Sequence, residues 1–250
     1  MRNTRCEQVL ALTGLLVLGP AARTAGGATI FVTSLDQKIS STGGCSLQEA
    51  IYSSNLQTNQ AIADVSPDGT PQFIETQCVP GTGNDTIVLP TSATLTMSHA
   101  VPDVYNYLGK TATPLIISTI TIEANGALLV RTGLGPARLF AVGDQTIAAP
   151  GGGTIAGTGA LTIRNAFIEG FSAQGGDGGK CGGGGGMGAG GAIYVTAGQL
   201  TIENSTFEAN TAMGGNSGGT CSLGDSRVGG GGGFSGGGGS FGGGGSSGDW

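Results

Sequence analysis

The sequence predicts an all-β chain folded as a right-handed parallel β-helix, a solenoid, with a short N-terminal capping helix and glycine-rich loops. The main observation is an internal repeat: Gly159 to Gly176 aligns with Gly198 to Gly215 at an offset of 39 residues, and 9 of the 18 positions are identical. Within each copy, apolar and polar residues alternate as in a half-buried strand. Self-similarity at a fixed period indicates stacked repeats.

Each repeat is predicted to hold three short strands whose residues stack in columns. Coils of a β-helix lie about 4.8 Å apart, so equivalent residues meet. A weaker copy of the first strand is present at 118–124, and the other strands are expected at 166–169, 206–208, 137–142 and 191–195. The columns form a ladder of inward apolar residues followed by an asparagine that tolerates a left-handed bend: Leu161, Ile163 and Asn165, then Leu200, Ile202 and Asn204.

A column of alternating charge is predicted on the outer face of the same strands. Glu123, Arg164 and Glu203 occupy equivalent positions of successive copies. The plain interpretation is a surface ion ladder, in which each pair contributes about 0–1 kcal/mol. A catalytic arginine flanked by two carboxylates is the alternative interpretation.

The repeat also carries two short motifs of a known family. Gly190-Gly191-Ala192-Ile193 is followed by Phe207-Glu-Ala-Asn210. This pair resembles the GGA(I/L/V) and FxxN motifs of chlamydial polymorphic outer-membrane proteins. Their passenger domains are β-helices displayed on the cell surface, so the resemblance implies the same fold and a surface location.

Residues 1–28 are predicted to be a secretory signal peptide. Arg2 and Arg5 precede an apolar run from Val9 to Leu18, which is too short to span a bilayer. We therefore expect a secreted or cell-surface protein of the outer membrane or extracellular space, with no transmembrane helix in the mature chain. The formal net charge of −6 argues against nucleic acid as a partner, because phosphates are bound by basic patches.

Residues 29–90 are predicted to cap the solenoid and to provide its first strands. A strand is expected at 28–33, and Ser46 and Glu49 fit a capping box that opens a short amphipathic helix. Such a helix covers the open end of a solenoid. The segment Cys45-Ser-Leu-Gln-Glu-Ala-Ile51, with Asp85-Thr-Ile-Val-Leu89 downstream, resembles the CSLREA signature of secreted bacterial β-helix proteins, although Gln48 replaces the usual arginine.

The coils are predicted to occupy residues 91–228, and residues 229–250 are predicted to be a disordered glycine- and serine-rich tail. Polar segments at 56–83 and 143–159 are interpreted as irregular or exposed loops. His99, the single histidine, is expected to face solvent in a loop. The glycine-rich insertions 175–190 and 214–233 are expected to leave successive coils at the same point.

Cysteine positions predict disulfides. Cys181 and Cys221 lie at matched places in the two glycine-rich insertions, while Cys45 and Cys78 flank the cap. The four cysteines of the predicted mature chain, which excludes Cys6, allow three connectivities, and stacking favours these two pairs. Free thiols, or a metal site built from all four thiolates, are the alternatives.

No cofactor is predicted. Gly83-Asn-Asp-Thr-Ile87 is similar to a calcium-binding nonapeptide, but a calcium roll needs tandem copies and one is present. The expected function is therefore a non-enzymatic, adhesin-like or structural one, with a surface glycan or a host or cell-envelope ligand as partner. The chain is also interpreted as a possible N-terminal piece of a longer protein.

The alternative function is a polysaccharide-active enzyme similar to pectate lyases or polygalacturonases, which share the β-helix architecture. That chemistry needs a cluster of carboxylates, or acids with a basic residue. Asp144, Asp177 and Asp225 all lie in predicted loops and have no close partner in the sequence.

Overall fold

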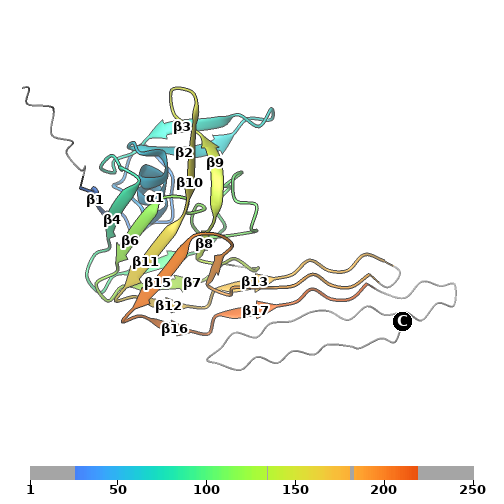
Figure 1. Cartoon of the computed structure of the whole chain (residues 1–250). Coiled ribbons are helices and arrows are strands. Elements are labelled where there is room, and N and C mark those ends of the chain that lie inside the picture. The colour runs from blue at the N-terminus through green and yellow to red at the C-terminus, as the bar shows by residue number, and fades with distance from the viewer. Residues whose placement is uncertain (1–25, 134, 181–182, 219–250) are drawn as a thin grey trace, which may run out of the picture.

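The computed structural model describes residues 26–133, 135–180 and 183–218, and it shows a parallel β-helix of about three turns. The predicted signal peptide and glycine-rich tail, at 1–28 and 229–250, lie almost entirely outside the described residues. The main wall of the solenoid is a five-stranded parallel sheet (Figure 1). Its strands, in spatial order, are β1 (Thr29–Phe31), β4 (Asn84–Val88), β6 (Thr119–Glu123), β11 (Ala160–Arg164) and β15 (Gln199–Glu203).

The predicted apolar ladder is present in this sheet. Leu161 lies opposite Leu200 and Ile120, and Ile163 lies opposite Ile202 and Ile122. Period two places these side chains inward, and the chain turns just after the strand ends. The predicted asparagines at the bend have left-handed φ angles, 56° at Asn165 and 47° at Asn204, and Asn125 of the preceding coil has a φ of 52° as well.

Two further walls complete each coil. The second wall is a four-stranded parallel sheet, and the third is made by paired strands. The second wall contains β5 (Thr94–Met97), β7 (Leu128–Arg131), β12 (Phe167–Glu169) and β16 (Thr206–Glu208). The third contains β8 (Phe140–Val142) beside β14 (Ile193–Val195), with β13 (Ser172–Gln174) beside β17 (Thr211–Met213).

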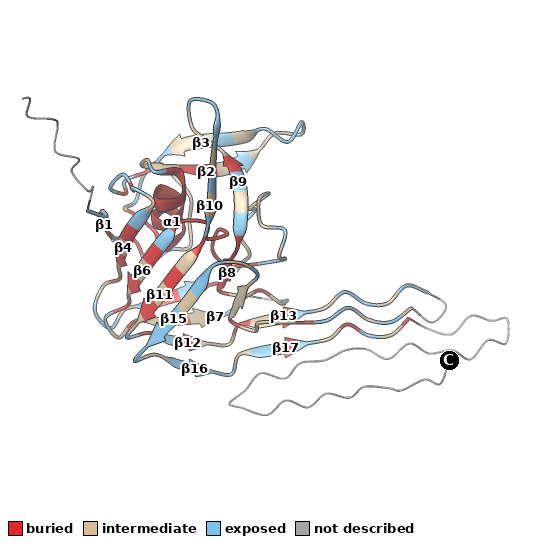
Figure 2. Ribbon diagram, in the orientation of Figure 1, coloured by how far each residue is buried: buried red, intermediate tan, exposed pale blue. Residues whose placement is uncertain are grey.

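Burial falls at the last described coil. Most of the inward residues of β6 and β11 are fully buried, whereas Ile202 in β15 is 45% exposed. Figure 2 shows β15 and β16 largely exposed at this end, in contrast to the buried helix at the other end.

The two short motifs, at 190–193 and 207–210, connect neighbouring coils of the solenoid. Gly190 has a φ of 62°, in the left-handed region, and the carbonyl of buried Ala192 accepts the backbone N–H groups of Leu139 and Phe140. Asn210 spans two coils, because its Nδ2 donates to Ile168 O (2.9 Å) and its Oδ1 accepts from Phe171 N (2.9 Å). Phe207 pairs in register with Ile168 and Ile193 with Phe140.

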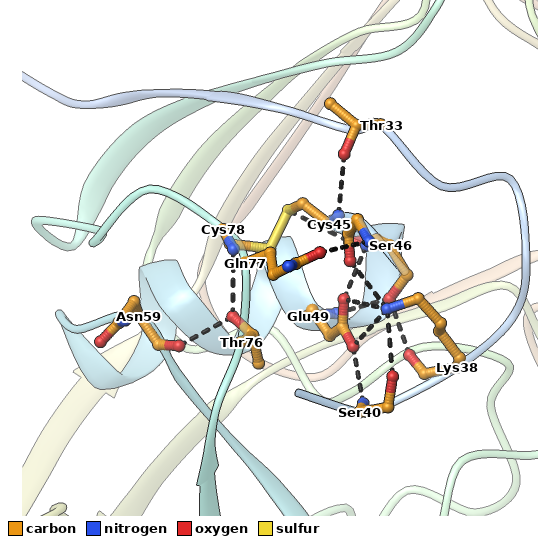
Figure 3. Close-up of a disulfide and its surroundings, with 11 residues drawn as sticks. Thr33, Lys38, Ser40, Cys45, Ser46, Glu49, Asn59, Thr76, Gln77 and Cys78 are labelled. Atoms are coloured by element: carbon orange, nitrogen blue, oxygen red, sulfur yellow. Dashed lines mark hydrogen bonds and ion pairs between the residues drawn. A yellow bond between two sulfur atoms is a disulfide. The ribbon is translucent and has the colours of Figure 1, made fainter. Parts of the chain in front are cut away.

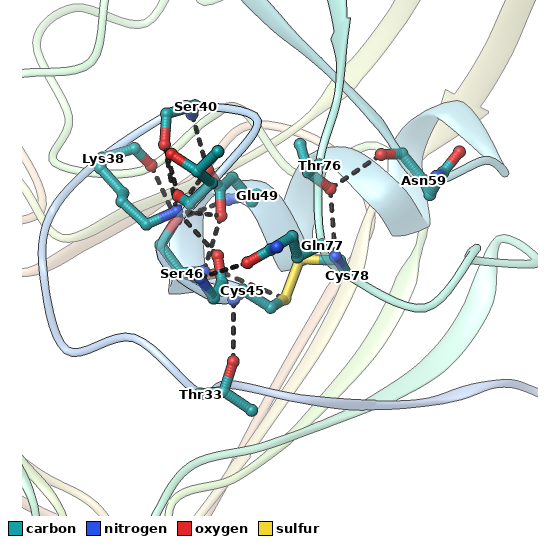
Figure 4. Close-up of polar contacts among 12 residues, drawn as sticks. Thr33, Lys38, Ser40, Cys45, Ser46, Glu49, Asn59, Thr76, Gln77 and Cys78 are labelled. Atoms are coloured by element: carbon teal, nitrogen blue, oxygen red, sulfur yellow. Dashed lines mark hydrogen bonds and ion pairs between the residues drawn. A yellow bond between two sulfur atoms is a disulfide. The ribbon is translucent and has the colours of Figure 1, made fainter.

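The predicted cap is a helix, α1 (Leu47–Leu56), and its capping box forms at Ser46 and Glu49. The expectation of an amphipathic helix is wrong, because all ten residues are buried (Figure 2). Burial of polar residues requires partners. Glu49 accepts from Lys38 Nζ (2.9 Å), Ser40 N (2.7 Å) and Ser46 N (2.8 Å), and Figure 4 shows these groups around it.

The predicted disulfide between Cys45 and Cys78 is present (Figure 3). Its Cα atoms are 4.7 Å apart, and both cysteines are buried. The bond ties the start of α1 to the segment that returns the chain to β4. The pair Cys181 and Cys221 lies outside the described residues.

Two predicted loops are antiparallel hairpins, so those predictions are wrong. The segment 56–83 contains β2 (Gln60–Val65) paired with β3 (Pro71–Glu75), and 143–159 contains β9 (Asp144–Ala148) paired with β10 (Thr154–Thr158). Each hairpin buries one apolar face against a second cluster beside the solenoid, through Ile62 and Ile147. The hairpins are therefore ordered insertions into the solenoid.

The glycine-rich insertions leave successive coils after β13 and β17, as predicted, and build an ordered structure that we call the arm. Its described segments are 175–180, 183–191 and 213–218, which run side by side away from the solenoid (Figure 1). Hydrogen bonds join the three in a ring: Gly178 N to Asn216 O, Gly218 N to Gly183 O and Gly186 N to Gly176 O, each 2.7 Å. Further bonds follow at three-residue spacing: Gly175 N to Met213 O, Gly215 N to Gly186 O and Gly183 N to Gly179 O.

A three-residue period is that of the polyproline II helix, and glycine at every third position is what allows three such chains to pack in collagen. The arm shows the same steric rule. A Cβ added to Gly178 would lie 2.0 Å from Gly183 O, whereas a Cβ on Gly179 would meet nothing within 4 Å. Three series of glycines where a Cβ would overlap backbone follow a three-residue spacing: Gly175 and Gly178; Gly185, Gly188 and Gly191; Gly215 and Gly218. Gly183 and Gly190 also leave no room for a Cβ and lie outside this spacing.

Candidate functional site

The predicted charge column is an ion ladder on the outer face of the main wall. Arg164 Nη1 lies 2.7 Å from Glu123 Oε1, and Arg164 Nε lies 2.7 Å from Glu203 Oε2. Hydrogen bonds to Glu123 and then to Glu203 raise the pKa of Arg164. The guanidinium is thus engaged between both carboxylates, which favours the structural interpretation over the catalytic one.

The other acids considered from the sequence are scattered. Asp144 accepts from Tyr107 OH (3.3 Å), and Asp177 accepts from Asn216 within the arm. Asp225 lies outside the described residues. Among the residues that the structure describes, none of these acids belongs to a group of three or more His, Cys, Asp or Glu side chains that could hold a metal ion.

The segment 83–87, which is similar to a calcium-binding motif, forms hydrogen bonds with the cap through Asp85. Asp85 accepts hydrogen bonds from Ser54 Oγ (2.7 Å), Thr82 Oγ1 (2.6 Å) and Ala28 N (2.8 Å). These bonds join α1 to the first two strands of the main wall. His99 is exposed in a loop, as predicted, with Nδ1 3.1 Å from Ser98 Oγ.

Two carboxylates that the sequence did not single out share one groove, which we call the hairpin groove. It has a volume of about 400 Å³ and lies between the β2–β3 hairpin and the segment 101–110. Its polar lining includes Asp64, Asp103 and Lys110. Its apolar lining includes Val101 and Val104, and the side chain of Val104 is 54% exposed. A concave surface with a few converging polar groups is typical of a ligand site.

Asp103 is the less exposed of the two acids in this groove. Burial raises its pKa, although Leu115 N donates to Oδ2 (2.7 Å) and Tyr105 N donates to Oδ1 (3.0 Å). Burial, and secondly the charge of Asp103, also raise the pKa of Tyr52, whose buried hydroxyl has no hydrogen-bond partner among the described residues. A carboxyl group whose pKa is raised by burial, in a concave surface, is a candidate functional group.

No sequence signal would have joined Asp64, Asp103 and Lys110. They belong to insertions outside the repeat, and their approach depends on the β2–β3 hairpin packing beside the segment 101–110. The hairpin itself had a signal, because Ser66-Pro67-Asp68-Gly69-Thr70 is a turn sequence between apolar residues.

Comparisons with known proteins give no family for this chain. No protein-family model, curated protein or solved structure matches it. Within the described residues, no helix has the length and apolar character needed to cross a membrane.

Proposed function

We propose that this chain is an exported, non-enzymatic surface protein with an adhesin-like role, in which the solenoid is a rigid scaffold and its insertions bind a surface glycan. One observation carries the proposal: the polar side chains of the solenoid wall are engaged between coils, as in Arg164 and Asn210, whereas the hairpin groove is open and lined by insertions. Binding residues are commonly carried on loops that a rigid scaffold positions.

The sequence supports export and surface display. Residues 1–28 have the features of a signal peptide, and the motifs at 45–51, 190–193 and 207–210 resemble those of secreted and surface β-helix proteins. The alternative non-enzymatic role is a purely structural one in the cell envelope. A deletion strain with normal attachment and altered envelope integrity would favour that role.

Binding by residues 29–250 to a polysaccharide panel and to intact cells tests the proposal. The variant Val104→Glu places a charge in the hairpin groove and is expected to reduce retention. Leu35→Glu is the matched control, because Leu35 is 45% exposed and does not line the groove. Absence of binding to every surface, or equal binding by both variants, would contradict the proposed site.

A polysaccharide-active enzyme is the second candidate, and Asp64 and Asp103 favour it. Glycoside hydrolases use two carboxyl groups, one with a raised pKa as the acid. Release of reducing ends from the same panel, abolished by Asp103→Asn and by Asp64→Asn in folded variants, would establish this activity. Unchanged polysaccharides after prolonged incubation would exclude those substrates.

A further inference from the structure

A second cavity lies where the arm leaves the solenoid, and we call it the arm cavity. Its volume is about 380 Å³, within the range of sites for small ligands. It shares Gly109 and Lys110 with the hairpin groove. The remaining lining comes mainly from the segment 136–138 before β8, from β13 and from the arm, including Arg138, Ser172, Gly176 and Met187.

The cavity concentrates positive charge in an acidic protein. The chain has a formal net charge of −6, yet Lys110 and Arg138 line this cavity and no aspartate or glutamate does. Two other described cations are neutralised, Lys38 by Glu49 and Arg164 by its two glutamates. Neither Lys110 nor Arg138 forms a salt bridge with a described residue.

Arg138 is held in place by its surroundings. Its Nε donates to the carbonyls of Ala189 (2.9 Å) and Gly190 (3.0 Å), and its Nη1 donates to Leu108 O (2.9 Å). Its guanidinium carbon lies 5.0 Å from the ring centroid of Tyr194. These contacts fix the guanidinium plane and leave Nη2 without a hydrogen bond to the described residues, so the donor is preorganised for a ligand.

The other walls suit a sugar ring. Ser172 contributes a hydroxyl group, and the N–H of Gly176 has no acceptor among the described residues. Leu108, Pro136 and the exposed Met187 provide apolar surface for the C–H face of a ring. The position of Gly176 depends on the arm, because its carbonyl accepts from Gly186 N (2.7 Å).

We propose that the arm cavity binds the carboxylate of an acidic sugar residue, a uronic or sialic acid, in the surface glycan. This inference rests on the proposed glycan-binding function and specifies its ligand. Arg138 and Lys110 bind the carboxylate by charge-assisted hydrogen bonds, while Ser172 and Gly176 contact ring hydroxyl groups. A polyanion such as nucleic acid does not fit, because its affinity depends on many phosphate contacts and the surface is otherwise acidic.

Calorimetric titration of the chain with two matched pairs of probes tests the inference. The pairs are hyaluronan tetrasaccharide with its carboxyl-reduced form, and sialyllactose with lactose. At least one acidic probe is expected to bind at least about 10-fold more tightly than its neutral partner, and less tightly at high salt.

Three variants test whether the ligand binds in the arm cavity. Lys110→Ala should weaken binding of the acidic probe about 10-fold, and Arg138→Lys should also weaken it because lysine has no planar fork to hold a donor in the place of Nη2. Lys180→Ala removes the same charge from the arm outside the cavity and should leave the affinity unchanged. If the acidic and neutral members of both pairs bind equally, or if Lys180→Ala matches Lys110→Ala, the inference is wrong while glycan binding stands. If no polysaccharide binds at all, the proposed function itself is wrong.

Discussion

The packing of the arm predicts that one added methyl group has opposite effects on stability at two neighbouring glycines. Gly178→Ala and Gly179→Ala add the same atom to neighbouring residues of one segment. The added Cβ would lie 2.0 Å from Gly183 O in the first variant and would meet nothing within 4 Å in the second. Neither glycine has a φ angle in the left-handed region, so the backbone conformation permits alanine at both positions.

The size of the effect follows from the hydrogen bonds that the methyl group displaces. To relieve the overlap, the segments must separate around Gly178 N to Asn216 O (2.7 Å), Gly218 N to Gly183 O (2.7 Å) and Gly183 N to Gly179 O (3.1 Å). At about 1 kcal/mol for each bond, the free energy of opening the arm falls by about 3 kcal/mol. Gly179→Ala instead stabilises by about 0.4–1 kcal/mol, because alanine restricts the unfolded chain.

Amide hydrogen exchange measures this opening directly. The amides of Gly178 and Gly218 are expected to exchange about 100-fold faster in Gly178→Ala, and no faster than in the parent chain in Gly179→Ala. The solenoid amides should keep their protection in both variants. Equal exchange in the two variants would refute the three-residue packing of the arm.

Three further predictions concern the cap. Reducing the Cys45–Cys78 disulfide, which joins residues 33 apart, should lower the free energy of unfolding by about 3.7 kcal/mol in urea titrations; an unchanged midpoint would contradict its role. Glu49→Ala should cost about 3 kcal/mol by the same assay, because the partly buried Lys38 partner and two backbone N–H groups lose their acceptor, and a loss under 1 kcal/mol would argue against the network. Burial acts to raise the pKa of Asp85, but hydrogen bonds from Thr82, Ser54 and Ala28 outweigh it and the pKa is lowered, so its stabilisation is present at neutral pH and is lost as the pH falls below about 3.8. Asp85→Asn should flatten that part of the stability profile, and a profile as steep as in the parent chain would assign the acid sensitivity elsewhere.

The repeat made the solenoid predictable. Leu161 and Leu200 occur at one offset with the same neighbours, so their column and its register follow from the amino-acid sequence alone. Asn165 and Asn204 indicated the bend, because few residues other than glycine accept a left-handed backbone. Ser46 and Glu49 indicated the start of the helix through a local rule.

The wrong predictions concern residues that lie outside the repeat. Gln48 and Asn55 are polar, which suggests a solvated face of the helix, but they bond to backbone carbonyls of the segment 112–115 and are buried. The β9–β10 hairpin contains Gly151, Gly152 and Gly153, which suggest a loose loop but form the turn between two strands.

The two cavities could not be predicted from sequence at all. Lys110 and Arg138 are 28 positions apart and share no motif, and they meet because the segment 101–110 packs beside β8 and the root of the arm. The arm itself had a signal in its glycine content. Its three-residue period emerges only when three segments are placed side by side.

Amide chemical-shift mapping with an acidic oligosaccharide tests the central claim most directly, because it shows which part of the molecule binds. Titration of ¹⁵N-labelled protein with hyaluronan tetrasaccharide, and separately with sialyllactose, is expected to shift the amides of 108–110 and 172–176, at the arm cavity. The resonances of Glu123, Arg164 and Glu203 on the solenoid wall should stay in place. Shifts along that charge column, with none at the insertions, would contradict the division of the molecule into scaffold and binding insertions.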